Sequence, residues 1–459
     1  MTDVVIVGYG PTGAVLANLL GQAGVDVTVV EPTTDVYHLP RAAHFDDEVM
    51  RVFQSVGLAA SVLPATTPVQ GMDFLAADGT RLFGFDAGHR PRRHGWESGY
   101  MFHQPDLERA LRAGVERFAN VTVHLGWEAV AVSADGVVEI RQVGTGEARM
   151  VRARYVVGCD GARSLVRRAI GATLDDHGFD QPWLVVDTML VEGASPALPE
   201  RVLQICDPGR PVTFVPSAGA HRRWEFMAMG SETAGELLDP AKVAQLLAPW
   251  VEVGRDVEVA RAAVYSFHAL VADRWRRGPL LIAGDAAHQM PPFLGQGMCA
   301  GIRDAANLWW KLAMVLDGRA GEALLDTYQS EREPHVRAII DLAVFLGGVI
   351  QTTDPAVAAV RDEQLRGDGS PPAEAGLPPL GPGCFHGSGA GVGRPFPQVR
   401  VGDDDALGPG FSVVHSGDLS TIVRPDRYVF AEAVGEAALA EATAALEKLV
   451  DPAMSSGRR

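Results

Sequence analysis

A stretch of small and polar residues, GDAAHQMPPFLGQG at 284–297, stands directly before an apolar stretch, 298–312, whose pattern predicts a helix. Asp285 follows a run of apolar residues that is typical of a buried strand. The N-terminus of a helix presents free N–H groups and a partial positive charge. Asp285 could therefore bind the hydroxyl groups of a sugar-alcohol chain, and the amides of residues 295–298 could contact the edge of an electron-rich ring. The alternative is an ordinary turn in which Asp285 caps a helix.

The N-terminal sequence contains a second candidate site, in which Gly8, Gly10 and Gly13 have the spacing G-x-G-x-x-G. In a dinucleotide-binding loop the first glycine permits a tight turn, and the second lets a pyrophosphate approach the backbone. The third lets the helix pack closely on the strand. Glu31 ends the next expected strand, where a carboxylate can bind ribose hydroxyl groups. The motif does not distinguish FAD from NAD, and the alternative is a turn that only packs a helix on a sheet.

A third motif, CDGARSLVRR, places Asp160 in a turn between an expected strand and an expected helix that carries arginines. The motif could contribute to nucleotide binding, because an anionic ligand is attracted by the arginines and by the helix N-terminus. Equally, Asp160 could cap the helix while the arginines are solvated.

Several expected elements must position these motifs. Residues 3–32 predict a βαβ unit whose helix ends at Gly24, and residues 103–118 predict a further helix. From 179 to 264 the sequence has short, alternating, turn-separated runs, which predict an antiparallel sheet. Residues 265–350 return to a buried strand followed by helices. The first domain is therefore expected to be interrupted by the sheet.

Composition restricts the class of protein. The chain has 459 residues, a hydrophobic content of 47% and a formal net charge of −17, which predict two or three domains and argue against a nucleic-acid binder. Its four cysteines form no metal-binding pattern, and we expect reduced thiols in a cytoplasmic protein and no metal site. No signal peptide is expected, and the longest apolar run, 338–350, is too short to span a bilayer, so we expect no membrane partner.

The three motifs together resemble the fingerprints of the FAD-dependent aromatic hydroxylases, the para-hydroxybenzoate hydroxylase superfamily, over roughly residues 3–350. Residues 40–58, 206–212 and 222–233 are most similar to those of the 3-(3-hydroxyphenyl)propionate hydroxylases. The resemblance implies an α/β fold with a Rossmann-like FAD-binding domain of the GR2 type, interrupted by an antiparallel-sheet substrate domain. The division we expect is 1–178 and 265–350 for FAD binding, 179–264 for the substrate sheet, 351–395 as a Gly/Pro-rich linker and 396–459 as a short thioredoxin-like remnant.

The resemblance also implies which residues bind FAD. Glycines 8, 10 and 13 match the ADP-binding loop, Glu31 the ribose contact, and Asp285 the contact to the ribityl chain. Arg41 and Gln104 fall where the family places residues beside the pyrophosphate and ribityl chain, and Asp160 matches an Asp used for both FAD and NAD(P)H. The full set of expected cofactor-binding residues is Gly8, Gly10, Pro11, Thr12, Gly13, Glu31, Arg41, Gln104, Asp160, Asp285, Pro291, Gly295, Gln296, Gly297 and Met298.

The activity implied is hydroxylation of a phenol similar to 3-(3-hydroxyphenyl)propionate. NADH or NADPH reduces the flavin, and the reduced flavin reacts with O₂ to form a C4a-hydroperoxide that transfers one oxygen atom. His44, three residues after Arg41, is the candidate base for the phenol, with a structural histidine as the alternative. The candidates for substrate contact are Arg210, Arg222 and Arg223, which could pair with a carboxylate, and Trp224 and Met227, which could cover the ring.

The chain departs from the family pattern at its C-terminus, where the middle of the usual thioredoxin-like domain is missing and no cysteine follows Cys384. This departure leaves the oligomeric state, for which a homodimer is possible, and the exact substrate open. Two other functions are open as well. One is a tailoring or inactivating monooxygenase of a polyketide or antibiotic, and the other is a flavin-binding redox sensor without turnover.

Overall fold

The computed structural model describes residues 1–36, 41–88, 92–366, 377–398 and 407–450. Its N-terminus forms the expected βαβ unit: strand β1 (Thr2–Val7), helix α1 (Pro11–Gln22) and strand β2 (Val27–Glu31). Gly24 follows the helix with φ of +78°, the left-handed conformation that ends many helices. β1 pairs in parallel with β2 and is almost completely buried, as its apolar sequence predicts.

The βαβ unit belongs to the first of two large sheets, in the order β17-β18-β11-β1-β2-β8. The strands from β11 to β8 and the pair β11–β18 run parallel, and β9 and β10 extend β11 as an antiparallel pair. The strands not yet given are β8 (Val121–Leu125), β9 (Trp127–Val132), β10 (Val137–Gln142), β11 (Ala148–Gly158), β17 (Arg276–Arg277) and β18 (Leu280–Ile282). The expected interruption is confirmed, because β18 lies beside β11 although the second sheet separates them in sequence.

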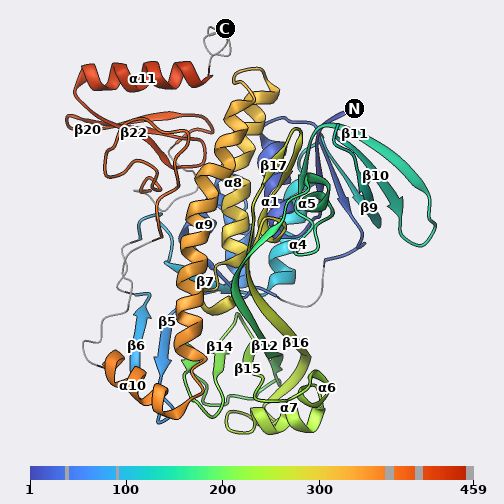
Figure 1. Cartoon of the computed structure of the whole chain (residues 1–459), viewed down its shortest axis with the longest axis vertical. Helices are drawn as coiled ribbons and strands as arrows, with labels where there is room; N and C mark the ends of the chain where they lie inside the picture. Colours follow the sequence, from blue (N-terminus) through green and yellow to red (C-terminus); the bar gives the residue numbers. More distant parts are fainter. Residues whose placement is uncertain (37–40, 89–91, 367–376, 399–406, 451–459) are drawn as a thin grey trace.

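The second sheet has the order β19-β16-β12-β15-β14-β13-β5-β6. Its strands are β5 (Gly71–Leu75), β6 (Arg81–Asp86), β12 (Leu174–Leu190), β13 (Val202–Ile205), β14 (Val212–Val215), β15 (His221–Met227), β16 (Val257–Ala272) and β19 (His288–Gln289). The long strands β12 and β16 pair with each other and extend the second sheet toward the first domain (Figure 1). Two features differ from the prediction: the hairpin β5–β6 comes from residues expected in the FAD-binding domain, and β13 pairs with β5 in parallel.

The two faces of the second sheet have different environments, because side chains alternate along each strand. On β15, Trp224 and Phe226 belong to a small core that helix α7 (Pro240–Leu247) covers. Met227 instead belongs to the main core of the first domain. One face of the second sheet therefore looks toward the first domain and the other toward α7, with the short helix α6 (Ala234–Leu237) before it.

Two long helices join the parts of the molecule. α8 (Gly297–Leu316) packs on α1, and α9 (Ala323–Ile350) runs past both large sheets (Figure 1). Smaller elements surround them: α2 (Asp47–Ser55), α3 (Ala59–Val62), η1 (Leu63–Ala65), α4 (Gln104–Val115), α5 (Leu165–Ile170), η2 (Gly284–Ala286) and η3 (Pro292–Leu294). A three-stranded sheet of β3 (His44–Asp46), β7 (Gly99–Phe102) and β4 (Thr66–Pro68) lies near the start of α2.

The segment expected to be a linker is partly folded, and the remnant at 396–459 stays a prediction. Helix α10 (Pro355–Arg366) falls within the expected linker 351–395, and residues 380–384 pack on α9 through hydrogen bonds to Glu331. An antiparallel sheet of β20 (Ser412–Ser416), β21 (Leu419–Val423) and β22 (Val429–Val434) precedes α11 (Glu436–Val450). This sheet and helix form a separate unit beside α8 and α9 (Figure 1). Within the two predicted segments, residues 367–376, 399–406 and 451–459 lie outside the described residues.

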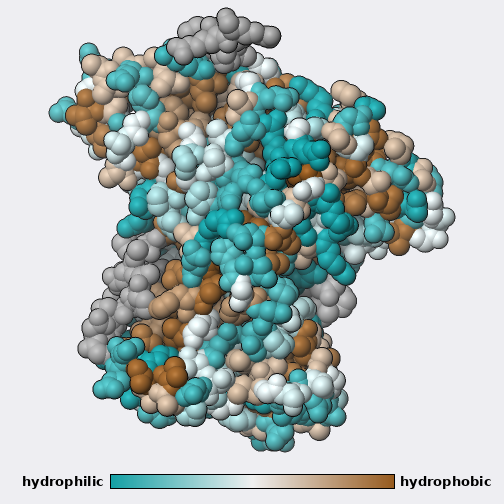
Figure 2. Space-filling view, in the orientation of Figure 1, coloured by the Kyte–Doolittle hydropathy of each residue, from teal (hydrophilic) through white to brown (hydrophobic). Residues whose placement is uncertain are grey.

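Among the described residues, no single helix has the length and apolar composition to cross a membrane. Among the described helices, α9 and α10 reach that length and apolar composition only when taken together, and they are bent by 117° with respect to each other. Hydrophilic and hydrophobic residues are interspersed over the face in Figure 2, and hydrophobic residues lie over α10, where Val357 and Val360 are 55% and 53% exposed. The described residues contain no group of three or more His, Cys, Asp or Glu side chains that could hold a metal ion. All four cysteines are free thiols, as predicted.

Candidate functional site

The glycine turn after β1 has the geometry that a bound pyrophosphate requires. Gly8 has φ of +99°, and a Cβ there would lie 2.4 Å from the carbonyl oxygen of Cys159. A Cβ on Gly13 would lie 2.1 Å from the carbonyl oxygen of Gly8, so the helix packs as closely as glycine allows. At Gly10, by contrast, no heavy atom lies within 4 Å of the Cβ position. Gly8 and Gly13 thus shape the turn, while Gly10 leaves open space at the N-terminus of α1, where an anion is favoured.

Glu31 lies at the end of β2 beside this turn. Its carboxylate accepts hydrogen bonds from the Tyr9 amide (2.9 Å) and from the Thr33 amide and hydroxyl (3.1 and 2.7 Å). These bonds fix the carboxylate next to the glycine turn. A surface pocket lined by residues 32–36, Gly126 and Val143 continues from it. The position fits contact with the ribose of an adenosine.

Asp160 has two oxygens in different situations. Oδ2 accepts hydrogen bonds from the amides of Leu165 and Val166 (2.6 and 3.2 Å), so the helix-capping alternative is correct for this oxygen. Oδ1 is buried and has no hydrogen-bond partner among the described residues. The Cys159 amide donates to Val7 (2.8 Å), which brings Asp160 to the end of β1. A buried carboxylate oxygen without a donor is costly, and a ligand hydroxyl or amide would satisfy it.

Asp285 lies in η2, the turn after β18, and its side chain is exposed. Surrounding protein atoms partly desolvate the carboxylate and raise its pKa above its usual range, although His288 and Arg41 oppose the shift. Thr12 of α1 lies against the turn, since a Cβ on Gly284 would be 2.7 Å from the Thr12 hydroxyl oxygen. Asp285 therefore lies beside the helix that begins at the glycine turn, although more than 270 residues separate the two motifs in sequence.

The backbone of the loop 291–298 is open where it leads into α8. Pro291 precedes η3, and Gly295 ends it with φ of +63°. At Gly297 the nearest atom to the Cβ position belongs to Met290, at 3.7 Å, and Met298 is half-buried. The side chain of Gln296 instead points into the protein, where it binds Asp46 and Arg303 (3.0 and 2.9 Å). The backbone of Gln296 could therefore make the predicted contact with the ring, whereas its side-chain amide is bonded to Asp46 and Arg303.

Gln104 shapes the segment before β3 rather than presenting its amide to a ligand. Its Oε1 accepts from the amides of Arg41 and Ala42, both at 2.7 Å, and its Nε2 donates to Glu108 at 2.7 Å. Direct contact of Gln104 with a cofactor stays a prediction. Arg41 is exposed and close enough to Asp285 to lower its pKa, so the segment faces the η2 turn.

His44 lies between two glycines. Its Nδ1 is 3.4 Å from the carbonyl oxygen of Gly295, and its Nε2 is 2.5 Å from the position that a Cβ on Gly99 would take. Burial lowers the pKa of His44, although Asp46 opposes the shift, which keeps the imidazole neutral near pH 7. Because both ring nitrogens face backbone, the geometry fits the structural alternative, and a role as catalytic base stays a prediction.

The five expected substrate residues have different surroundings, and three of them are held by other parts of the protein. Arg210 forms a bidentate pair with Glu232 (2.9 and 2.7 Å), and Arg223 pairs with Asp187 (2.7 Å), so neither guanidinium is available for a substrate carboxylate without losing that partner. Trp224 is fully buried in the core beneath α7, on the face that points away from the first domain. These partners are distant in sequence, which is why the sequence alone did not reveal them.

For Arg222 and Met227, contact with the substrate stays a prediction. Arg222 donates to the carbonyl oxygens of Gly219 and His221 (2.8 and 2.6 Å), and its buried Nε has no partner among the described residues. Met227 is 9% exposed in the main core, and Trp183 opposite it stacks edge-on against Phe293 of η3 at 5.6 Å. The second sheet therefore meets the loop 291–298 through an aromatic contact.

Two neighbouring residues of α8, Arg303 and Asp304, were missed by the sequence analysis. Asp304 is fully buried and accepts from the Gly284 amide (3.0 Å), which holds the η2 turn, and its other partners are His288 and Arg332 (2.6 and 2.9 Å). The sequence does show charged residues in an otherwise apolar helix. Charged residues are rarely buried unless they are paired, so this pattern could have indicated buried partners.

Comparison with known proteins places these observations in a family. The family model described as "FAD binding domain" matches residues 1–343. A probable NADH-specific resorcinol 4-hydroxylase of Rhodococcus jostii (strain RHA1) is 42% identical over 450 residues, which cover 95% of this chain and 83% of the relative. A 3-(3-hydroxy-phenyl)propionate/3-hydroxycinnamic acid hydroxylase of Mycobacterium sp. (strain KMS) is 44% identical over 369 residues. This match covers 80% of the chain but only 63% of the relative's own length.

Solved structures agree on the fold. Aklavinone-11 hydroxylase in a ternary complex with FAD and aklavinone is similar with a TM-score of 0.81 at 21% identity, over 98% of both chains. The flavin-dependent monooxygenase PieE, in complex with FAD and substrate, is similar with a TM-score of 0.79 at 20% identity, over 98% of this chain and 99% of that one. The predicted fold, a Rossmann-like FAD-binding domain interrupted by a sheet domain, is thereby confirmed.

Proposed function

The chain belongs to the family of FAD-dependent aromatic hydroxylases, and on that premise we propose that it hydroxylates a small meta-substituted phenol with NADH as reductant. Resorcinol and 3-(3-hydroxyphenyl)propionate, named for the two relatives, are both phenols with a substituent in the meta position. The NADH preference follows the relative from Rhodococcus. Molecular oxygen as co-substrate, a homodimer and a cytoplasmic location without nucleic-acid or membrane partners belong to the same proposal.

One observation carries the proposal: the three motifs, far apart in sequence, lie around a single region. The glycine turn, Asp160 and the η2 turn adjoin one another through Thr12 and Cys159. The loop 291–298 continues from η2 to the second sheet, where Phe293 meets Trp183. An elongated dinucleotide would reach from the glycine turn to this loop, with its ring end next to the sheet. The proposed division of the chain is therefore 1–70, 87–178 and 265–350 for FAD, and 71–86 together with 179–264 for the substrate.

In this arrangement the protein binds, orients and excludes water. FAD, when bound, takes two electrons from NADH and allows one oxygen atom of O₂ to be transferred to the phenol. The N-terminus of α1 and Gly10 would hold the pyrophosphate, Glu31 the ribose and Asp285 the ribityl chain. Free N–H groups at the start of α8 would stabilise negative charge on the ring edge. Met227, Trp183 and Phe293 would keep water from the reacting region.

The two alternative functions receive less support. A polyketide-tailoring role has a counterpart in aklavinone-11 hydroxylase, but that likeness is at 21% identity and speaks for the fold alone. The relatives at 42% and 44% identity are named as hydroxylases of small phenols. A redox sensor without turnover has no named counterpart among these relatives.

A panel of phenols tests the proposal. The FAD-loaded protein is mixed with NADH and resorcinol, 3-(3-hydroxyphenyl)propionate or unsubstituted phenol, and NADH loss, hydrogen peroxide and hydroxylated product are measured together. We expect at least one meta-substituted phenol to accelerate NADH oxidation tenfold or more, with product in place of peroxide. A yellow protein that oxidises NADH at one slow rate with every phenol would contradict the proposal and favour a sensor.

A further inference from the structure

The C-terminal unit is joined to the core by a hydrogen bond between buried side chains. Tyr428, just before β22, is 5% exposed, and its hydroxyl donates to Oε1 of Glu48 at 2.6 Å. Glu48 lies in the first turn of α2 and is itself 9% exposed. The bond therefore links residue 428 to a helix formed near the start of the chain, in surroundings where a charge-assisted hydrogen bond is strong.

From Glu48 the contacts continue to the loop that precedes α8. Oε2 of Glu48 accepts from Nε of Arg303 at 2.7 Å, and Nη1 of Arg303 donates to the side-chain oxygen of Gln296 at 2.9 Å. Arg303 also pairs with Asp46, which in turn accepts from Nε2 of Gln296 at 3.0 Å. Gln296 is thus held at both ends of its amide, and three bonded contacts separate it from Tyr428.

The two carboxylates in this cluster can accept more hydrogen bonds than Arg303 alone donates. Two carboxylates, Asp46 and Glu48, share the single guanidinium of Arg303, and all three side chains are at most about a tenth exposed. Burial by itself raises the pKa of Asp46, but Arg303 outweighs it and the net pKa is lowered, so this carboxylate stays charged. The hydroxyl of Tyr428 supplies Glu48 with a further hydrogen bond without adding charge. Removing it leaves a buried carboxylate oxygen short of a donor.

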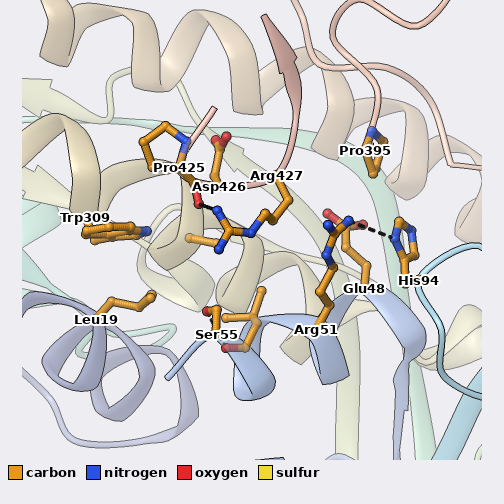
Figure 3. A pocket seen from close by; sticks show the side chains of 12 residues that line it. Leu19, Glu48, Arg51, Ser55, His94, Trp309, Pro395, Pro425, Asp426 and Arg427 are labelled. Carbon is orange, nitrogen blue, oxygen red and sulfur yellow. Dashed lines mark hydrogen bonds between the residues drawn. The ribbon is translucent and has the colours of Figure 1, made fainter. Parts of the chain in front are cut away.

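The junction around this cluster is closely packed. Figure 3 shows Pro395, Pro425, Asp426 and Arg427 of the C-terminal part facing α2 and Trp309 of α8 across a small cavity. The cavity measures about 20 Å³, which holds about one water molecule. A movement of the C-terminal unit is therefore transmitted to α2 and α8 rather than absorbed by free space.

We propose that Tyr428 is a positioning residue for the loop 295–298, acting through Glu48, Arg303 and Gln296. The inference rests on the proposed function, in which this loop contacts the flavin ring. It gives the C-terminal unit a role in the active site through the contact of Tyr428 with Glu48. The loop amides would keep their orientation because Gln296, in the middle of the loop, cannot rotate away.

The test compares Tyr428→Phe with Tyr155→Phe. The control also removes a hydroxyl that donates to a glutamate, Glu322, at 3.2 Å, but within the first domain and outside the cluster. Amide hydrogen exchange is followed by mass spectrometry in the FAD-free and FAD-loaded proteins. We expect exchange of the peptide 290–300 to become about tenfold faster in Tyr428→Phe, in both forms, and to stay unchanged in Tyr155→Phe. A tenfold change corresponds to about 1.4 kcal/mol, close to the lower end of what a hydrogen bond to a charged group contributes.

A second readout uses the loaded enzyme. The fraction of NADH oxidation that ends as hydrogen peroxide should rise severalfold in Tyr428→Phe, and the visible spectrum of bound FAD should change. Unchanged exchange of 290–300 together with wild-type coupling would overturn the inference. Faster exchange over the whole C-terminal unit but not in 290–300 would also overturn it, because it would indicate a local structural role. Failure of the wild-type protein to hydroxylate any phenol would instead count against the proposed function, while the exchange result in the FAD-free protein would still decide the positioning role.

Discussion

The pKa of Glu225, on β15, affects how the stability of the protein depends on pH. It is 6% exposed, lies between Arg223 and Met227 on the face toward the first domain, and is 3.8 Å from the guanidinium of Arg223. Burial raises its pKa to about 7, although Arg223 lowers it and Asp187 raises it further. Between the ordinary glutamate pKa of 4.5 and about 7, the folded protein keeps a proton that the unfolded chain has lost. The contribution of Glu225 to stability therefore falls as pH rises through this window.

The substitution Glu225→Gln removes this dependence. The free energy of unfolding of the variant minus that of wild type should be larger at pH 8 than at pH 5. The increase should be on the order of 2 kcal/mol. Thermal unfolding of both proteins at the two pH values measures the difference. The exposed Glu258→Gln on β16 serves as control and should show none. If Glu225→Gln changes the free energy of unfolding equally at both pH values, the pKa of Glu225 is not raised by burial.

Sequence patterns predicted residues whose role depends on local backbone. Gly8, Gly10 and Gly13 each have the geometry that their spacing implied, because a turn between strand and helix is a local property. Residues whose role depends on a distant partner could not be predicted. Arg210 and Arg223 were candidates for a substrate carboxylate, but Glu232 and Asp187 occupy them, and nothing in the sequence pairs these residues.

Helix α8 connects the two turns of the site. Its adjacent residues Arg303 and Asp304 point to different partners: Arg303 holds Gln296 in the loop, and Asp304 holds the amide of Gly284 in η2. One helix thereby fixes both the contact expected for the ribityl chain and the contact expected for the ring. A shift of α8 would displace both.

Helix α9 anchors the C-terminal unit through Glu331, which is fully buried. Its carboxylate binds Lys311, Arg424 and Asn307 (2.8, 2.9 and 2.7 Å) and the Cys384 amide (2.7 Å). Burial favours the neutral acid, but Arg424 and Lys311 outweigh it and hold the pKa of Glu331 well below its usual range. Glu331→Gln would leave two buried cations with too little negative charge, which costs roughly 3–5 kcal/mol.

The matched control for this prediction is Glu333→Gln on the same helix. Glu333 pairs with Arg337 at 2.9 Å, and the two side chains are 23% and 28% exposed. A pair of this kind contributes at most about 1 kcal/mol. Thermal unfolding should therefore show a large drop in melting temperature for Glu331→Gln and a small one for Glu333→Gln. Similar small drops in both would mean that the C-terminal unit does not depend on the buried cluster.

Elements formed by local periodicity were predicted, and those that depend on long-range pairing were not. The βαβ unit and helix α4 follow from their apolar spacing and terminal residues. The hairpin β5–β6 was not assigned to the second sheet, because its parallel pairing with β13 joins residues about 130 positions apart. Helix α10 was hidden within a segment whose Gly and Pro content predicted a linker.

At the scale of the whole molecule, the two large sheets and the C-terminal unit meet around α8 and α9 (Figure 1). Chain order alone predicted that the FAD-binding domain is interrupted, since a buried strand reappears after the inserted sheet. The docking of the C-terminal unit was not predictable. It depends on Tyr428 reaching Glu48 across 380 residues, and no sequence pattern encodes such a contact.

The central claim is that one FAD molecule extends from the glycine turn to the η2 turn. FAD affinity of Gly10→Ala and Asp285→Ala tests it, because Gly10 would touch the pyrophosphate and Asp285 the ribityl chain. Alanine fits the protein at Gly10, which has φ of −71° and no atom within 4 Å of the Cβ position, so only a ligand would meet the added methyl group. The controls are Gly348→Ala, an exposed helical glycine with equally open space, and Asp317→Ala, an exposed carboxylate at the end of α8.

The decisive measurement is the dissociation constant of FAD, determined by fluorescence titration of the FAD-free proteins. We expect both Gly10→Ala and Asp285→Ala to bind FAD at least tenfold more weakly than wild type, a loss of about 1.4 kcal/mol or more. Their melting temperatures without FAD should be unchanged, and both controls should bind normally. Wild-type affinity in either Gly10→Ala or Asp285→Ala would contradict the claim that a single FAD joins the two turns.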